Sequence, residues 1–162
     1  MNATNDVVVI AIGNPYRRDD GVGPALAERL AARQPSGVDI EVLDGEPTRL
    51  LDAWTGARLA IVIDAVLCQP AQPGRIHRTR LDDLPTGRPA ASSHGMGIPE
   101  AVALGTVLDR LPRRLIVYAV EAADIGFGTD LTPEVAAALP ALLDAVRADI
   151  ADDVGRSDDP ED

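Results

Sequence analysis

The chain has no lysine, one cysteine and two histidines among its 162 residues, and each scarcity excludes a class of chemistry. Without lysine it holds neither a phosphate-binding P-loop nor a Schiff-base catalyst, because both need the lysine amine. Its lone cysteine, Cys68, excludes an intrachain disulfide and a cysteine-rich zinc site. A mechanism that depends on histidine must therefore use His77 or His94.

Aromatic residues and long apolar runs are also scarce. Aromatics make up 2% of the chain and hydrophobic residues 46%, so the core must consist mainly of alanine, valine, leucine and isoleucine. No apolar run reaches the roughly 18 residues of a membrane span. The first residues lack the basic and apolar regions of a secretion signal. We therefore expect a cytoplasmic protein with no membrane partner.

Acidic residues outnumber basic ones by 26 to 15, which gives a net charge of -11. A nucleic-acid-binding protein normally carries a basic patch, so this balance argues against DNA or RNA as a partner. Most of the acidic residues are interpreted as a source of solubility. We expect the protein to be a monomer.

Segments typical of strands and helices alternate along the chain. Continuous apolar runs and one alternating run predict parallel strands, and apolar stripes and caps predict the helices between them. The turn at 69–74 is too short for a crossover helix, so the strand at 75–80 should run antiparallel to the third strand. The parallel strands are expected at 7–12, 38–43, 59–63 and 115–120, and the helices at 24–33, 47–54, 99–111 and from 131 onward.

This alternation predicts the α/β class: a three-layer α/β/α sandwich around a mixed five-stranded sheet with one antiparallel strand. Residues 1–150 are expected to form a single domain. Residues 151–162 are acidic and polar, so we expect a disordered tail.

Several polar residues fall where ligands bind in such folds, outside the carboxyl ends of the strands. Asp20 lies in the loop after the first strand, Asp44 follows the second and Asp64 ends the third, while Glu121 follows the last. His94 precedes a helix that must run opposite to the last strand. It should therefore lie at the same edge as the acidic residues.

Crowded carboxylates repel one another unless a cation joins them. Asp20, Asp64 and His94 offer two oxygens and one nitrogen, which suit several divalent ions, nickel and zinc among them. Three protein ligands leave positions open for substrate or water. Asp19 is interpreted instead as an acid that stabilises a helix N-terminus.

Two other metal-ligating residue types are given passive roles. The arginines at 75, 78 and 80 flank His77, and their positive charge disfavours a bound metal ion there. Cys68 is interpreted as a small residue near a turn.

Five motifs in register resemble the [NiFe]-hydrogenase maturation endopeptidases, over about residues 7–150. The opening motif IGNPYRRDDGVG at 12–23 has the Gly-Asn turn and acidic pair of that family, and the strand-end aspartate and histidine loop follow in order. The other matching segments are LDG at 43–45, IDAV at 63–66, SHGMG at 93–97 and the stretch 121–133.

The resemblance implies an enzyme that removes a C-terminal peptide from the precursor of a hydrogenase large subunit after nickel insertion. It implies that Asp20, Asp64 and His94 contact the nickel that the precursor carries, although other divalent ions could bind the isolated protein. As a hypothesis, the docked nickel positions the scissile bond and polarises its carbonyl or a water, and Asp20 or Asp44 acts as general base.

Two alternatives remain. The Gly13-Asn14-Pro15 opening also resembles bacterial peptidyl-tRNA hydrolases, but that family has a catalytic histidine where this chain has its acidic pair. The second alternative is a non-catalytic nickel-sensing maturation factor with the same pocket.

Overall fold

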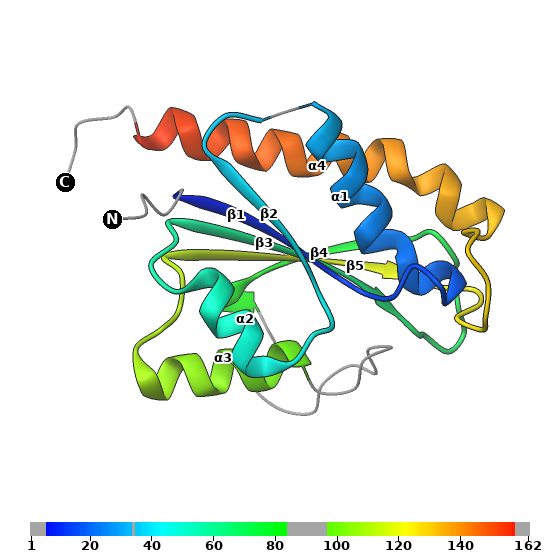
Figure 1. The fold of residues 1–162 in the computed structure, drawn as a ribbon, viewed down its shortest axis with the longest axis horizontal. Coiled ribbons are helices and arrows are strands. Elements are labelled where there is room, and N and C mark those ends of the chain that lie inside the picture. The colour runs from blue at the N-terminus through cyan, green and yellow to red at the C-terminus, as the bar shows by residue number, and fades with distance from the viewer. Residues whose placement is uncertain (1–5, 34, 84–96, 158–162) are drawn as a thin grey trace.

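The computed structural model describes residues 6–33, 35–83 and 97–157, and its strands form a mixed five-stranded sheet (Figure 1). The order is β2-β1-β3-β5-β4, in which β4 is antiparallel to β5 and the other neighbours are parallel. The strands are β1 (Val7–Ile12), β2 (Val38–Leu43), β3 (Leu59–Val66), β4 (Ile76–Arg80) and β5 (Arg114–Glu121).

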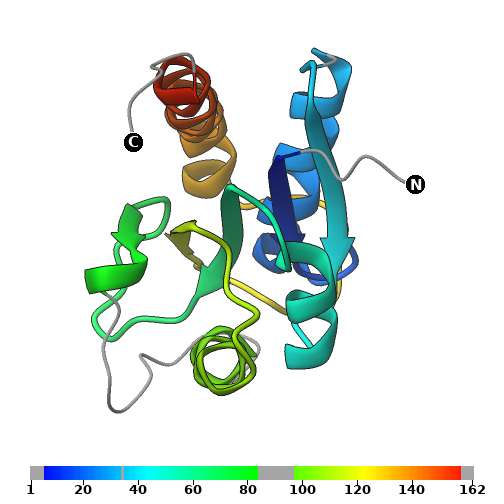
Figure 2. The ribbon, with the colours of Figure 1, turned by 90° about the vertical axis from the view of Figure 1, so that its left-hand side faces the viewer.

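Helices cover both faces of this sheet, which confirms the predicted α/β sandwich. Helices α1 (Val22–Ala32) and α4 (Pro133–Ser157) lie on one face, and α2 (Pro47–Trp54) and α3 (Gly97–Leu108) lie on the other (Figure 2). Two 3-10 helices complete the described elements, η1 (Arg18–Gly21) and η2 (Leu81–Asp83).

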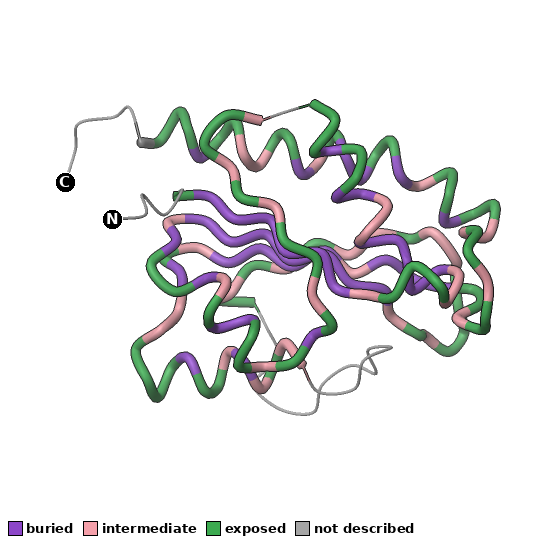
Figure 3. The backbone as a smooth tube through the Cα atoms, in the orientation of Figure 1, coloured by how far each residue is buried: buried purple, intermediate pink, exposed green. Residues whose placement is uncertain are grey.

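The central strands are buried on both faces (Figure 3). Because side chains alternate along a strand, odd-numbered residues of β3 such as Ile61 pack under α1 and α4, and even-numbered ones such as Val62 pack under α2 and α3. Trp54 and Tyr118 are buried packing residues. Each large apolar side chain buried here contributes roughly 1.5–3 kcal/mol to folding.

The antiparallel strand runs in the predicted direction but does not pair with β3. Strand β5 lies between β3 and β4, so β4 forms an edge of the sheet. The short turn after β3 sets the direction of β4, whereas the neighbour is decided by β5, which comes later in the chain.

The prediction of a disordered tail from residue 151 is wrong for residues 151–157, which continue α4. Residues 158–162 lie outside the described part of the chain. Asp153 explains the extra helical turns, because its carboxylate is buried against the sheet, 2.8 Å from Nη2 of Arg58 and 3.3 Å from Nη1 of Arg114. The acidic run therefore contains one residue that is a structural anchor.

Helix α4 has a second polar anchor one turn earlier. Asp149 accepts hydrogen bonds from Arg78 of β4, at 2.8 Å, and from the Tyr118 hydroxyl of β5. Pro140 lies inside this helix, which continues past it. In the described ranges, no helix has the length and apolar character needed to cross a bilayer.

Replacing Asp153 by alanine should lower the free energy of unfolding by about 2–3 kcal/mol, because two arginines lose their buried partner. The loss should fall short of that for a fully buried pair, since the arginine side chains are 28% and 27% exposed. Urea unfolding followed by circular dichroism measures it. The matched control is Asp152→Ala, at a neighbouring residue whose side chain is 58% exposed. Equal stabilities of the two variants would contradict the anchoring role of Asp153.

Candidate functional site

The turn between β1 and η1 closes around Asp20, which is buried. The Asn14 amide donates a hydrogen bond of 2.9 Å to Oδ2 of Asp20. Gly13 has a φ of 146°, and a Cβ atom there would lie 1.9 Å from the carbonyl oxygen of Asp20. Only glycine permits this approach, so the Gly-Asn turn of the sequence motif positions the Asp20 carboxylate.

Asp64 lies inside β3 rather than after its end, because the strand continues to Val66. Its side chain is 3% exposed, and its Oδ1 accepts a hydrogen bond of 2.8 Å from the Ala65 amide. By alternation it shares the face of Val62, the side covered by α2 and α3. A carboxylate so buried in an apolar strand must be stabilised by polar partners.

Asp20 and Asp64 are brought to the same edge of the sheet. The 3-10 helix that carries Asp20 contacts β3, and Gly23 packs tightly on the strand ends. A Cβ atom at Gly23 would lie 2.7 Å from the Ile12 carbonyl oxygen and 3.2 Å from that of Ile63. The segments that carry the two aspartates are therefore closely packed at this edge.

His94 lies outside the described residues, so its part in the pocket stays a prediction. The structure does locate the start of the helix that follows it. A Cβ atom at Gly97, the first residue of α3, would lie 2.4 Å from the carbonyl oxygen of Gly45, just after β2. Helix α3 thus begins at the carboxyl edge of the sheet, as predicted.

Asp44 is an exposed turn residue. Its Oδ1 accepts a hydrogen bond of 3.1 Å from the Glu46 amide, and Glu46 in turn caps α2. The catalytic role suggested for Asp44 stays a prediction.

Asp19 holds the loop between β5 and α4. It is fully buried and accepts hydrogen bonds of 2.8–3.0 Å from the amides of Ala123, Asp124 and Thr132 and from the Thr132 hydroxyl. From the sequence, Asp19 was interpreted as an acid that stabilises a helix N-terminus. That interpretation did not include these partners, which are more than 100 residues away in the chain. The two adjacent aspartates of the motif thus bind different segments.

The same two loops are joined along their backbones. The Arg18 amide donates to the Gly128 carbonyl, and the Gly128 amide donates to the Tyr16 carbonyl, both at 3.0 Å. The Arg18 Nε donates to the Phe127 carbonyl at 3.3 Å. Tyr16 and Phe127, two of the four aromatic residues in the chain, are 68% and 93% exposed on these loops.

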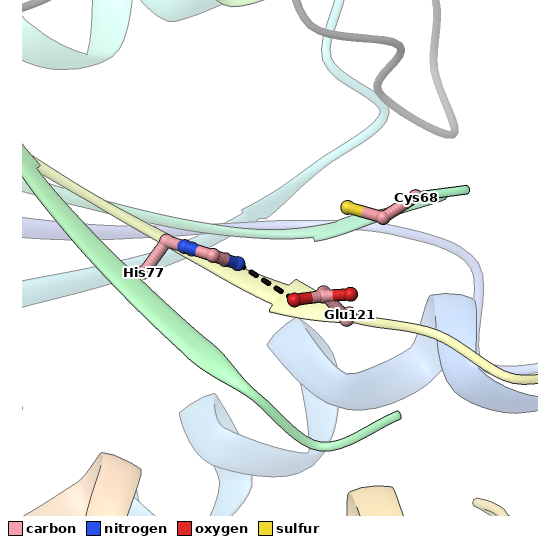
Figure 4. A group of neighbouring side chains, drawn as sticks. All are labelled: Cys68, His77 and Glu121. Carbon is pink, nitrogen blue, oxygen red and sulfur yellow. Dashed lines mark hydrogen bonds and ion pairs between the residues drawn. The ribbon is translucent and has the colours of Figure 1, made fainter. Parts of the chain in front are cut away.

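A second group of metal-ligating side chains, Cys68, His77 and Glu121, lies at the ends of β3, β4 and β5 (Figure 4). His77 Nε2 and Glu121 Oε2 are 2.8 Å apart. The Gln72 amide, and then His77, lower the pKa of Glu121, while burial and the nearby Glu121 carboxylate raise the pKa of the Cys68 thiol. Glu121 was predicted to lie at this edge, but the grouping was not. The alternation of side chains along residues 75–80 could have shown that His77 and Arg78 point to opposite faces of the strand.

A family model described as hydrogenase maturation protease matches residues 24–148. The chain belongs to this family. Among curated members, the hydrogenase expression/formation protein HupD of Bradyrhizobium diazoefficiens is 30% identical over 136 residues, 81% of this chain and 70% of that protein. HupD of Thiocapsa roseopersicina is 29% identical over 140 residues, 83% of this chain. The present chain spans 63% of the length of that Thiocapsa protein.

Solved structures of maturation proteases have the same fold. The hydrogenase maturating endopeptidase HybD from E. coli superposes with a TM-score of 0.76 at 24% identity, covering 91% of this chain and 93% of HybD. An endopeptidase from Escherichia coli gives a TM-score of 0.75 at 23% identity, with 88% and 90% covered. The mixed five-stranded sheet predicted from the sequence is thus the fold of this family.

Replacing Asp19 by alanine should lower the free energy of unfolding by about 3 kcal/mol or more, because three amides and a hydroxyl lose a buried acceptor. The β5–α4 loop should also become sensitive to limited proteolysis. Chemical unfolding and protease digestion measure the two effects. Asp130→Ala, at an exposed position of the same loop, should change stability by less than about 0.5 kcal/mol. A stable, protease-resistant Asp19→Ala protein would exclude this role.

Proposed function

We propose that the protein is an endopeptidase that removes a C-terminal peptide from a [NiFe]-hydrogenase large-subunit precursor after nickel insertion. The observation that carries the proposal is the buried Asp64 near the carboxyl end of β3, on the face where α3 begins, in a chain of the maturation protease family. Membership of that family favours this activity over peptidyl-tRNA hydrolysis.

In this proposal Asp20, Asp64 and His94 recognise the nickel that the precursor carries. Two carboxylates and an imidazole are suitable ligands for a divalent ion of this kind. A divalent ion would also neutralise negative charge on the two buried aspartates. The nickel is thus part of the substrate, and other divalent ions could take its place in the isolated protein.

Docking of the nickel would place one peptide bond of the precursor beside the pocket. Water then adds to the carbonyl carbon, the C–N bond breaks and the proton from the water passes to the leaving amine. Asp20 or Asp44 accepts that proton first, as general base. Asp20 is buried, whereas Asp44 is exposed and accessible to a bound substrate.

We also assign a docking role to Tyr16 and Phe127. Large apolar side chains this exposed gain free energy when a partner covers them, and aromatic residues are enriched at the centres of protein interfaces. They extend from the loop that positions Asp20 and from the loop that Asp19 holds. The precursor is therefore the proposed occupant of this surface.

The cytoplasmic location and the monomeric state stay predictions.

Asp64→Asn should leave the fold intact and slow processing of a nickel-loaded precursor by roughly 100-fold or more, because the substrate metal loses a charged ligand. Mass spectrometry of the precursor over time measures the loss of the C-terminal peptide, and thermal unfolding checks the fold. Asp130→Asn, an exposed acid, is the matched control. Processing of the precursor by Asp64→Asn at the normal rate would show the assignment to be wrong.

If the wild-type protein forms a nickel-dependent complex with the precursor without any loss of mass, the protein is a non-catalytic nickel-sensing factor.

Phe127→Ala should weaken precursor binding about tenfold while the rate of cleavage at saturating precursor stays near normal, because the side chain contributes contact area and no chemistry. Titration of the precursor in the processing assay separates KM from kcat. Val107→Ala is the control, since Val107 is 81% exposed near the end of α3 that lies away from the pocket. Unchanged binding by Phe127→Ala would rule out this docking surface.

A further inference from the structure

Three side chains with different metal-ligating atoms come together at the ends of three strands. Cys68 follows β3 by two residues, His77 lies near the start of β4 and Glu121 ends β5. One ligand atom from each lies within 4.8 Å of the other two (Figure 4). Ligands about 2.0–2.3 Å from a tetrahedral ion are roughly 3–4 Å apart, so small side-chain rotations would bring all three onto one ion.

From this arrangement we propose a second metal site, in which Cys68, His77 and Glu121 bind one divalent ion of intermediate softness, such as Zn²⁺, Ni²⁺ or Co²⁺. A thiolate, an imidazole and a carboxylate together suit such ions better than Mg²⁺ or Ca²⁺, which prefer oxygen ligands. The thiolate and the carboxylate carry two negative charges, which balance the ion. Three protein ligands leave a fourth position for water or substrate.

The ligands are held in place by the surrounding backbone. Glu121 is bonded on both sides of its peptide, because its amide donates to the Arg75 carbonyl at 2.9 Å and its carbonyl accepts from Gly74 at 2.8 Å. Its Oε1 accepts a hydrogen bond of 2.9 Å from the Gln72 amide. That contact leaves Oε2 directed at His77. In metal sites, a hydrogen bond of this kind from a neighbouring group orients the carboxylate that binds the ion.

Of the arginines beside His77, Arg78 is directed away from the proposed site, whereas Arg75 lies close enough for its charge to act on the Cys68 thiol. Residues 77 and 78 project to opposite faces of β4. Arg78 therefore reaches α4, where its Nη2 lies 2.8 Å from Asp149. The His77 side chain is 40% exposed and gives the ion an entry path, while the Glu121 side chain is 4% exposed.

The same geometry argues against a catalytic triad with Cys68 as nucleophile. In a triad the histidine lies between the nucleophile and the acid. Here His77 Nε2 is bonded to Glu121 Oε2, and the nearby Glu121 carboxylate raises the pKa of the Cys68 thiol. An acid beside the thiol favours its protonated form, whereas a metal ion would displace that proton and bind the thiolate.

The proposed metal site lies on the same face of the sheet as Asp64, but it shares no ligand with the set Asp20, Asp64 and His94. Asp64 pairs in register with Ala119, two residues before Glu121 and on the same face of the sheet. The site therefore does not rest on the proposed processing activity.

Titration of the chelator-treated full-length protein with CoCl₂, without added thiol, tests the site. Cys68 is the sole cysteine, so a sulfur-to-cobalt charge-transfer absorption in the near ultraviolet reports on it alone. We expect one equivalent of Co²⁺ to produce this absorption and Zn²⁺ to remove it. Cys68→Ser should abolish the band. His77→Gln, which can keep a hydrogen bond to Glu121, should weaken Co²⁺ binding at least tenfold.

Asp64→Asn is the matched control, because it alters the neighbouring pocket and should keep the cobalt–sulfur band at its normal affinity. Thermal unfolding of each variant confirms that it is folded. Absence of the band in the wild-type protein would overturn the proposal. A band that His77→Gln and Glu121→Gln both leave unchanged would also overturn it, since the thiol would then bind cobalt without the other two ligands.

Discussion

The buried carboxylate of Asp19 joins two parts of the molecule on which the rest of the site depends. It accepts hydrogen bonds from the loop that links β5 to α4, while its own backbone belongs to the 3-10 helix that leads into α1. The next residue, Asp20, is bonded by the turn after β1. Because adjacent residues of a 3-10 helix point about a third of a turn apart, one short helix can serve both functions. The position of Asp20 therefore depends on the loop bound by its neighbour.

Much of the fold followed from local patterns in the sequence. The apolar run at Val7–Ile12 and the alternating run at Val38–Leu43 were predicted with the bounds that the structure has, and the helix before Trp54 was predicted correctly. The errors concern interactions between distant segments. No local pattern shows that β5 would lie between β3 and β4, or that Asp153 in an acidic run would meet Arg58. Strand neighbours and buried ion pairs are decided by packing, which a single stretch of sequence does not contain.

The same distinction applies to the candidate site. Asp20 and Asp64 could be predicted because each follows or ends an apolar strand, and parallel strands bring such positions to one edge. The group of Cys68, His77 and Glu121 was missed because it requires β4 to lie beside β5 in a particular register, in which His77 pairs with Ala119. Of the flanking arginines, Arg78 lies on the opposite face of β4 from His77 and binds Asp149 of α4. The role of His94 depends on a segment outside the described residues.

The exposed Phe127 lies on a loop whose backbone is already bonded on both sides, through Arg18 and Gly128. A flexible loop loses conformational entropy when a partner immobilises it, and this loss subtracts from the affinity. In this protein the loop that carries Phe127 loses its conformational entropy during folding, before it meets a partner. A partner that covers Phe127 therefore meets a surface that is already in its binding conformation, so association can be rapid and can rest on a small contact area.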